Sequence, residues 1–264
     1  MIGLGLNATK TPTVNTNIVR DGLVLRHDYK DRPVEPVSSG AAYFDDAADD
    51  YISIGDPDNL SFSTGSFSVS CWVNANTVGS AVNTHSEFII GKGDNANIGV
   101  GVATGYALAL HNSRTDWVFW VGDGTDRAFT QTTVQPSANQ WYHLCGTFDT
   151  SGTDIARLYV NGVLVDSNEQ ALGDIDIAND FRIGRTAHAT YDFGGYVCNA
   201  GIWDAALTQP QIKSIMNKDY AALSASEKEH LVSWWNLDEE TATDGTAGTG
   251  GVKDHKGSNH GTLA

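Results

Sequence analysis

Short alternations of apolar and polar residues, separated by Gly, Asp and Asn, run through most of this chain and constrain its fold more than any other feature. Alternation with a period of two is typical of β-strands, and the intervening residues are typical of tight turns. We expect strands at 23–27, 42–44, 51–54, 66–74, 87–92, 106–112, 117–122, 141–149, 156–160, 164–166, 180–184, 195–203 and 231–237. Because so many strands exceed one sheet, the sequence predicts an all-β fold with two packed antiparallel sheets or a closed barrel.

Two segments predict local detail within this pattern. In FSVSCWV the alternation places Phe67, Val69, Cys71 and Val73 on one face and Ser68, Ser70 and Trp72 on the other, which predicts a half-buried strand. In LYVNGVLV, Asn161 and Gly162 both tolerate positive φ, so they predict a two-residue type I′ hairpin turn.

The helical signal is confined to residues 208–230. Thr208 and Gln211 form a capping box, and an apolar stripe at helical spacing follows it. Ser226 and Glu229 give a weaker second cap. We therefore expect one or two short helices near the C-terminal part of the chain.

The charge balance restricts the partners. The 264 residues include 16 Lys and Arg against 32 Asp and Glu, a net charge of −16 with His neutral. Affinity for nucleic acid rests on counterion release by basic residues, so this balance argues against nucleic acid and anionic membranes. The surplus carboxylates suit either solubility, which we prefer, or divalent cations. No run of about 18 apolar residues occurs, so we expect no membrane insertion.

The cysteines and the start of the chain bear on its compartment. Cys71, Cys145 and Cys198 are an odd, sparse set without a legible disulfide framework. The opening MIGLGLNATKTPTV lacks a basic region, a sustained apolar stretch and a cleavage site, so we expect either use without export or a trimmed chain. Residues 1–20 have no clear periodicity and are predicted to be an N-terminal arm or attachment segment.

The order of motifs resembles a known family. Along the chain come AAYFDDAADDYISI, SFSVSCWVN, FIIGKGD, YALALHN, WYHLCGTFD, ARLYVNGVLVDS, FRIGR and FGGYVCNAGIWDAALTQPQI, and WWNLDE and DHKGSNHGTL follow. Together they resemble laminin G-like members of the concanavalin A-like lectin/glucanase superfamily. The resemblance implies a jelly-roll sandwich over residues 21–264, with a concave face or a loop rim that binds glycans or protein surfaces.

Several aromatic residues occupy family-like positions that imply packing: Trp72, Trp141, Trp203, Trp234 or Trp235, and His143. Near the ends of the chain, GLVLRHDYKD and HLVSWWNLDE echo each other. We expect these two similar segments to pair as neighbours in one sheet.

The positions of the carboxylates in the sequence indicate whether the chain is a glycoside hydrolase. Enzymes of this superfamily are mainly glycoside hydrolases, which need two carboxyl groups about 5 Å or about 6.5 to 9.5 Å apart. The nearest candidates are Asp174 and Asp176 in GDIDIAND. The family-like Glu-x-Asp-x-x-Glu signature is absent, and Cys198 and Asn199 stand where many relatives have an Asp-Glu pair. We therefore expect no enzyme activity, no catalytic residue and no required cofactor.

A calcium ion is the one metal that the pattern suggests. The candidate ligands are Asp45, Asp46, Asp49 and Asp50, which lie together in a predicted turn. Hard oxygen ligands from a turn suit Ca²⁺, although no EF-hand spacing is present. The alternative, which we prefer, is that these acids end a hairpin and face water.

The segment DWVFWVGDG is the best sequence candidate for a ligand surface. Alternation points Trp117 and Phe119 to one face of this strand and Trp120 to the other, so one aromatic set lies off the core side. The predicted ligand-binding residues are Trp120, His111, Asn112, Arg114 and Asp116. The alternative is that a curved sheet buries aromatic residues on both faces under loops.

Three functions compete: a non-catalytic module that recognises a glycan or cell surface, a structural protein of a larger assembly, and a glycosidase. The missing export signal favours a virion component released by lysis. Our preferred prediction joins the first two as a virion decoration, fibre or appendage protein with glycan or host-surface binding. A stand-alone lectin module is the alternative. A homo-oligomer is compatible with the sequence, which contains no indication of its symmetry.

Overall fold

The computed structural model describes residues 34–48, 50–79, 86–93, 103–111, 115–185, 192–239 and 251–264. The chain divides into two units, residues 1–33 and residues 34–264, and all described residues belong to the second. The expected arm, the expected strand at 23–27 and its pairing lie outside the described residues. Within the described part, no helix has the length and apolar character needed to cross a membrane.

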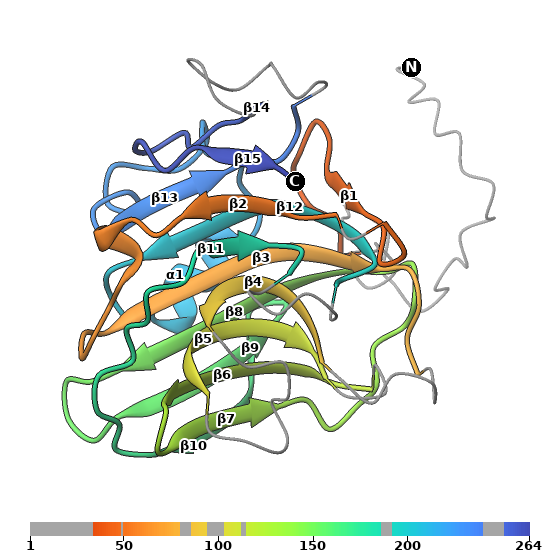
Figure 1. The fold of residues 1–264 in the computed structure, drawn as a ribbon. Helices are drawn as coiled ribbons and strands as arrows, with labels where there is room; N and C mark the ends of the chain where they lie inside the picture. The colour runs from red at the N-terminus through yellow and green to blue at the C-terminus, as the bar shows by residue number, and fades with distance from the viewer. Residues whose placement is uncertain are drawn as a thin grey trace, which may run out of the picture. The chain divides into compact units, whose positions relative to one another are not determined.

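Two antiparallel sheets form a sandwich, as the sequence predicts (Figure 1). The seven-stranded sheet has the order β1 (Ala42–Phe44), β12 (Gly195–Trp203), β3 (Phe67–Ala75), β8 (Trp141–Asp149), β9 (Ile155–Val160) and β10 (Val163–Glu169), with β13 (Leu231–Trp235) also beside β12. The eight-stranded sheet has the order β14 (Gly251–Val252), β15 (Gly261–Leu263), β2 (Ile52–Gly55), β11 (Phe181–Ile183), β4 (Glu87–Gly93), β5 (Thr104–Leu110), β6 (Trp117–Asp123) and β7 (Arg127–Gln131). The described helices are α1 (Gln209–Ile215) and the 3₁₀ turn η1 (Asp58–Leu60). This arrangement is consistent with a jelly roll.

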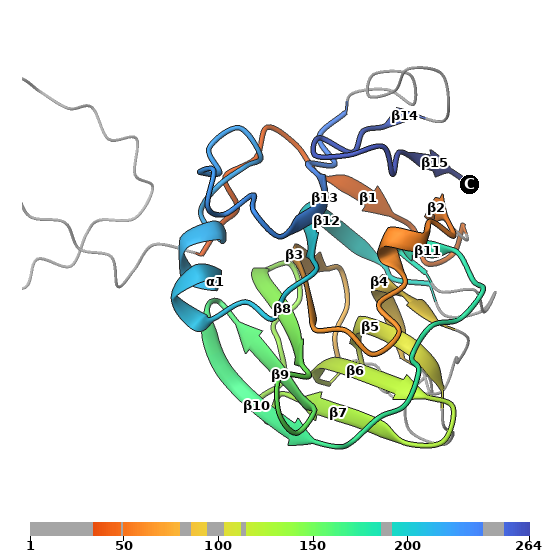
Figure 2. The ribbon, with the colours of Figure 1, turned by 90° about the vertical axis from the view of Figure 1, so that its left-hand side faces the viewer.

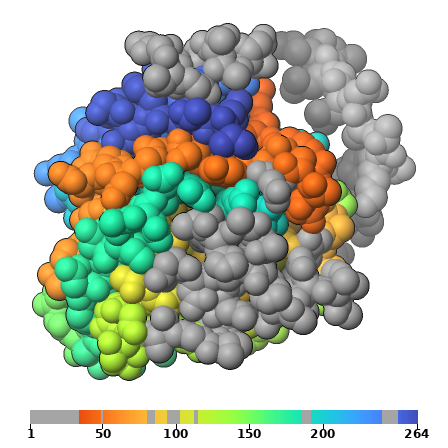
Figure 3. All heavy atoms as spheres, viewed as in Figure 1, coloured from red at the N-terminus to blue at the C-terminus, as the bar shows by residue number. Residues whose placement is uncertain are grey.

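The C-terminal strands complete the eight-stranded sheet. Figure 3 shows them in blue beside β2 in orange, and Thr262 of β15 pairs with Ser53 of β2. Tyr51 and Ala264 add a reciprocal pair of backbone hydrogen bonds of 3.2 and 3.0 Å.

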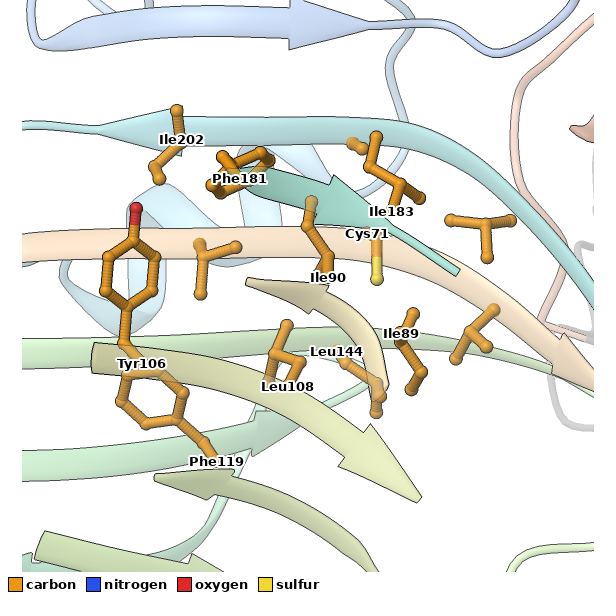
Figure 4. Packing of buried hydrophobic residues seen from close by; sticks show 14 of the residues in the cluster. Cys71, Ile89, Ile90, Tyr106, Leu108, Phe119, Leu144, Phe181, Ile183 and Ile202 are labelled. Atoms are coloured by element: carbon orange, nitrogen blue, oxygen red, sulfur yellow. The ribbon is translucent and has the colours of Figure 1, made fainter. Parts of the chain in front are cut away.

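The core lies between the two sheets. The inward residues of β3 are those that alternation predicts, and Phe67, Val69, Cys71 and Val73 are fully buried. Figure 4 shows Cys71 near Ile89 and Ile90 of β4 and Leu144 of β8, so both sheets contribute side chains to the same apolar layer. Burial of this layer from water supplies the main stabilisation of the sandwich.

The outer face of β3 is also buried, so the prediction of a half-buried strand is wrong. Residues 204–230, which include α1, form a cover over this face (Figure 2). Ser68 Oγ donates a hydrogen bond to the carbonyl of Ala205 at 2.7 Å. Trp72 Nε1 donates to the carbonyl of Met216 at 2.8 Å. Ser68 and Trp72 are therefore paired with the cover, whereas Ser70 Oγ on the same face is buried without a hydrogen-bond partner.

Two capping motifs lie within the cover. The predicted capping box at the start of α1 is confirmed. The second cap lies two residues earlier than expected: Ser224 N donates to Glu227 Oε2 at 2.8 Å, and Glu227 N donates to Ser224 Oγ at 3.3 Å. The sequence had suggested Ser226 and Glu229. Glu227 forms the cap in place of Glu229 because its carboxylate also accepts a hydrogen bond from Lys218 Nζ at 2.6 Å.

The predicted hairpin between β9 and β10 is confirmed. Val160 pairs with Val163, and the turn residues Asn161 and Gly162 have φ values of 51° and 72°. Positive φ at both positions is the signature of a type I′ turn.

Strand β12 organises the end of the sheet where the candidate site lies. On the side of β12 away from β3, two strands share the edge: β1 pairs with residues 195–197, and β13 pairs with residues 200–203. Between them the register shifts at a bulge, where Asn199 has a φ of 47°. Asn199 Nδ2 donates to the carbonyl of Val37 at 2.8 Å, which ties the segment before β1 to the bulge.

Candidate functional site

Four side chains form a row across the outer face of the seven-stranded sheet, which we call the aromatic row. Tyr43 on β1 lies opposite Tyr196 on β12. Tyr196 in turn lies opposite Asn74 on β3, and Asn74 lies opposite Trp141 on β8. Since neighbouring strands are about 4.8 Å apart, the row spans about 14 Å.

The row faces outward because the residues beside its members pack inward. The core includes Phe44, Val197 and Val73, which are sequence neighbours of row residues, and Tyr142 packs against it. Successive side chains of a strand point to opposite faces, so Tyr43, Tyr196, Asn74 and Trp141 share the outer face.

The cover leaves this end of the sheet exposed. The next residues along the same face, Trp72 and Cys198, are buried against Met216 of the cover. By contrast, Tyr43 is 50% exposed and Tyr196 is 40% exposed. The ring centroids of these two tyrosines are 4.9 Å apart, and those of Trp141 and Tyr196 are 6.4 Å apart. The surface therefore presents adjacent aromatic rings to solvent.

Polar groups lie among the rings. Asn76 Nδ2 donates to Tyr43 Oη at 3.1 Å, which leaves the hydroxyl proton available to a ligand. Asn74 Oδ1 is shielded from solvent and has no hydrogen-bond partner. A buried acceptor without a donor is costly to the fold.

A pocket of about 360 Å³ adjoins the row. Trp141 and Tyr196 form one side, and residues of the segment 35–41 form the other. Glu35 is an exposed residue of this lining, and no described residue is its hydrogen-bond or ion-pair partner. The pocket thus combines aromatic surface with one unpaired acidic group.

The wall of this pocket is held by one local hydrogen bond and by side chains of distant segments. Ser38 Oγ donates to the carbonyl of Gly40 at 2.6 Å. Ser39 Oγ donates to a carboxylate oxygen of Asp238. With the bond from Asn199 to Val37, these contacts fix the segment that precedes β1.

Sequence reasoning missed this site. Trp141 was expected to pack in the core, but it is only partly buried and lies on the outer face. The other expected packing residues, Trp72, Trp203, Trp234, Trp235 and His143, are buried. The available signal was parity: Tyr43 and Tyr196 each stand next to inward-facing residues in a predicted strand.

The structure places the predicted ligand residues in different surroundings. Trp120 faces away from Trp117 and Phe119, as expected, but it is 1% exposed and packs with Phe88 in a second apolar cluster. His111 N donates to the carbonyl of Asp116 at 2.7 Å, so these two are brought together. Asn112 and Arg114 lie outside the described residues. As placed, Trp120 presents no exposed ring, and a ligand surface there stays a prediction.

The acidic turn is partly described. Asp45 Oδ1 accepts from Ala47 N at 3.0 Å, and Asp50 Oδ2 accepts from Asp45 N at 3.2 Å. Asp46 lies beside Gly194, and Asp49 lies outside the described residues. These bonds show carboxylates that organise the turn, and calcium binding there stays a prediction.

Another group of potential metal ligands occurs among the described residues. The ligating atoms of three side chains come within 4.8 Å of one another: Asp238, Glu239 and His255. Glu239 Oε1 accepts from Lys253 N at 2.9 Å. Burial, together with the positive charge of Lys253, lowers the pKa of His255 despite the nearby carboxylates. Two carboxylates and a neutral imidazole are ligands that a divalent cation accepts.

Of the two aspartates considered for hydrolysis, Asp176 is engaged with a buried lysine. Lys92 Nζ lies 2.9 Å from Asp176 Oδ1 and 2.6 Å from Asp56 Oδ1. Burial raises the pKa of Asp176, but hydrogen bonds from Lys92 and Ser61 outweigh it and hold that pKa below its usual range. A glycosidase acid needs a raised pKa instead. Asp174 accepts the backbone N–H of Asp176 at 2.9 Å.

Comparison with known proteins gives one family match. Residues 46–213 match the family described as the concanavalin A-like lectin/glucanases superfamily. No curated protein matches the chain.

Solved structures are similar to this chain, and the first of them shares its fold. The chain is similar to a proposed carbohydrate-binding protein from Bacteroides ovatus, with a TM-score of 0.62 and 23% identity, over 84% of this chain and 57% of that one. This chain therefore corresponds to little more than half of that protein. It is also similar to domain 4 of AbnA, a GH43 extracellular arabinanase from Geobacillus stearothermophilus solved with arabinotriose, with a TM-score of 0.47 and 20% identity, over 67% of this chain and 76% of that one.

Proposed function

The chain belongs to the concanavalin A-like lectin/glucanase superfamily, and on that premise we propose that it is a non-catalytic module that binds a glycan on the aromatic row. The observation that carries the proposal is the pair of half-exposed tyrosines with Trp141 beside them on one sheet face. The likeness to a proposed carbohydrate-binding protein supports the same class of ligand.

Sugar rings offer both surfaces that the row can use. Their C–H faces stack on aromatic rings, and their hydroxyls pair with amides and carboxylates. Tyr196 and Tyr43 supply the rings, while the Tyr43 hydroxyl and the side chain of Glu35, which lines the adjoining pocket, supply polar groups. With a length of about 14 Å, the row suits a short oligosaccharide better than a single sugar.

Binding without hydrolysis follows from the carboxyl groups. Among the described residues that line the pocket beside the row, Glu35 is the one acid, whereas glycoside hydrolysis needs two. Asp176 forms an ion pair with Lys92. Cys198 and Asn199 stand where many relatives have an Asp-Glu pair. Cys198 is buried, and Asn199 Nδ2 donates a hydrogen bond to the carbonyl of Val37. The module therefore holds a glycan unchanged.

A further part of the proposal concerns where such a module acts. We propose a virion surface as the place where such a module would meet a host glycan, with a stand-alone lectin as the alternative. Tyr and Trp are also enriched in protein interfaces, so the same row would suit contact with another virion protein. To distinguish a virion protein from a stand-alone lectin, we would measure whether the chain co-sediments with particles. The same measurement is made on wild type and on row variants.

The decisive experiment is a glycan array followed by calorimetry on the hits. The test variant replaces Tyr43, Tyr196 and Trp141 by Ala, and the matched control replaces Val163 and Leu164, which are similarly exposed at the far edge of the same sheet. We expect the control to bind like wild type and the test variant to lose binding while it melts as wild type does. No hit with the wild type, or equal binding by both variants, would contradict the proposal.

A further inference from the structure

A group of potential metal ligands lies where the chain leaves β13, on side chains that the aromatic row does not use. Asp238 and Glu239 follow β13, and His255 follows β14 in the C-terminal segment. One ligating atom of each side chain lies within 4.8 Å of the other two, and all three residues are partly buried. We call these three side chains the carboxylate–imidazole cluster.

The two carboxylates of the cluster are not balanced by a cation in contact with them. Neither Asp238 nor Glu239 forms an ion pair with a Lys, Arg or His among the described residues. The positive charge of Lys253 acts on His255, but Lys253 is not an ion-pair partner of either carboxylate. Two carboxylates this close repel each other, and a cation placed between them replaces the repulsion by attraction.

Each carboxylate is oriented through one oxygen and keeps the other without a hydrogen bond. Ser39 Oγ donates to Asp238 Oδ2, and Lys253 N donates to Glu239 Oε1 at 2.9 Å. Asp238 Oδ1 and Glu239 Oε2 accept no hydrogen bond from a described residue. Carboxylates that bind a metal are commonly held in this way, because a hydrogen bond to one oxygen fixes the direction of the other.

The position of His255 is fixed by the strand beside it. Its backbone N–H donates to the carbonyl of Trp234 at 2.8 Å, and its neighbour Asp254 forms a β-bridge with Trp235. The imidazole packs beside Tyr220, with ring centroids 5.6 Å apart. Neither ring nitrogen forms a hydrogen bond with a described residue, so the imidazole is available as a ligand.

The distances leave room for an ion between the ligands. The imidazole forms neither a hydrogen bond nor an ion pair with the carboxylates, so direct contact does not account for the cluster. Zn²⁺ binds nitrogen and carboxylate oxygen at about 2.0 to 2.2 Å, so tetrahedral geometry places its ligands about 3.4 Å apart. The ligating atoms are at most 4.8 Å apart and would have to approach by about 1 Å, which side-chain rotation allows.

The mixture of nitrogen and oxygen ligands selects the ion. Ca²⁺ takes about six to eight oxygen ligands, whereas an imidazole with carboxylates is a ligand set that suits Zn²⁺. We propose that Asp238, Glu239 and His255 bind a Zn²⁺ ion, with water completing its coordination. The ion cross-links the end of β13 to the C-terminal segment that supplies β15.

Calorimetry on the full, untagged chain tests the proposal, with ZnCl₂ and CaCl₂ as the added salts. We expect a single Zn²⁺ to bind per chain and Ca²⁺ to bind at least about tenfold more weakly, because the imidazole favours Zn²⁺. In a ¹⁵N–¹H spectrum of the histidine side chains, Zn²⁺ should shift the ring signals of His255, which His255→Gln identifies by their loss. Absence of zinc binding, or equal affinity for the two ions, would overturn the proposal.

Variants of each ligand locate the bound ion. His255→Gln, Asp238→Asn and Glu239→Gln should each weaken zinc binding at least about tenfold. The last two keep an oxygen that accepts the hydrogen bond from Ser39 or Lys253, so they test the site even if His255→Gln disturbs the fold. Zinc affinity that stays at the wild-type value in the Asp238 and Glu239 variants would overturn the proposal.

His230→Gln is the matched control. His230 also lies beside a carboxylate, with Nδ1 2.9 Å from Asp204 Oδ1, but it lies outside the cluster. This variant should bind Zn²⁺ as wild type does, and a loss as large as that of His255→Gln would overturn the proposal. Zinc affinity is measured without a glycan, so this proposal and glycan binding by the aromatic row can fail independently.

Discussion

Tyr196 and Tyr43 lie directly opposite each other on β12 and β1, with ring centroids 4.9 Å apart and planes tilted by 50°. Their strands are more than 150 positions apart in the sequence, and the pairing of β1 with the first residues of β12 brings them together. Because β13 takes over the same side of β12 beyond the bulge at Asn199, the two rings stand at the boundary between the covered and exposed parts of the sheet.

Tyr196→Ala should weaken glycan binding without unfolding the protein. Loss of one exposed stacking ring is expected to cost about 1 to 2 kcal/mol, or about five- to thirtyfold in affinity. Stability should change by less than about 0.5 kcal/mol, since the ring is 40% exposed. Calorimetry with an array-selected glycan measures the first quantity and urea unfolding the second. Tyr196→Phe, which keeps the ring, should bind nearly as wild type, and a loss as large as that of the alanine variant would exclude stacking.

The Glu35 carboxylate should select against anionic glycans. It lies in a pocket whose described lining includes no basic residue. Replacing it by Gln is expected to raise affinity for a uronic-acid or sialylated glycan about two- to fivefold at low salt, and the gain should fade as salt screens the charge. Affinity for a neutral glycan should change less. A gain that is equal for neutral and anionic glycans would show that the carboxylate does not act through its charge.

Much of the fold follows from local periodicity. The predicted segments 42–44, 141–149 and 195–203 coincide with β1, β8 and β12. Alternation of apolar and polar residues is enough to predict these strands, although the bulge at Asn199 shifts the alternation within β12. By contrast, β7 (Arg127–Gln131), β14 and β15 were not predicted. They are short or polar, and pairing with neighbours such as β6 and β2 defines them.

The aromatic row could not be predicted, although its residues stand in predicted strands. Each strand reveals which side chains face outward, but not which strands are neighbours. Asn74 and Trp141 meet Tyr196 through the order β12-β3-β8, a long-range relationship. The sequence argument selected Trp120 because alternation places its ring off the core side of the strand. The outer face of β6 is itself buried, as the alternative of aromatic residues buried on both faces predicts.

Gly146→Ala should destabilise the sandwich. A Cβ at Gly146 on β8 would lie 2.2 Å from the ring of Phe119 on the facing sheet, and that ring is fully buried. Overpacking of this kind is expected to cost about 1 to 3 kcal/mol. Gly152→Ala is the matched control, because nothing lies within 4 Å of its added Cβ. Urea unfolding of the two variants should differ by at least about 1 kcal/mol, and equal midpoints would show that the sheets separate easily.

Glu227→Gln should loosen the cover over the outer face. Burial raises the pKa of Glu227, but hydrogen bonds from Lys218, Ser214 and Ser224 outweigh it and lower that pKa to about 2. A folded pKa below the unfolded value stabilises the protein above the unfolded pKa of about 4.5, and this contribution is lost as pH falls toward 2. At neutral pH the variant should lose about 1 to 3 kcal/mol, and its deficit should shrink in acid. Hydrogen exchange at residues 204–230 measures the local effect, which should not extend to β5.

His143 should make the protein less stable as the solution becomes acidic. It is 2% exposed, its ring lies 5.5 Å from that of Trp72, and burial lowers its pKa from 6.5 to about 3. The folded chain then keeps His143 neutral while the unfolded chain takes up a proton below pH 6.5, so stability falls as pH decreases toward 3. The slope from this one group approaches about 1.4 kcal/mol per pH unit. His143→Phe removes the titrating group, so its stability relative to wild type should rise from pH 7 to pH 4, after the packing difference at pH 8 is subtracted. Chemical denaturation at each pH gives both curves, and parallel curves would mean that His143 gains a proton in the folded state.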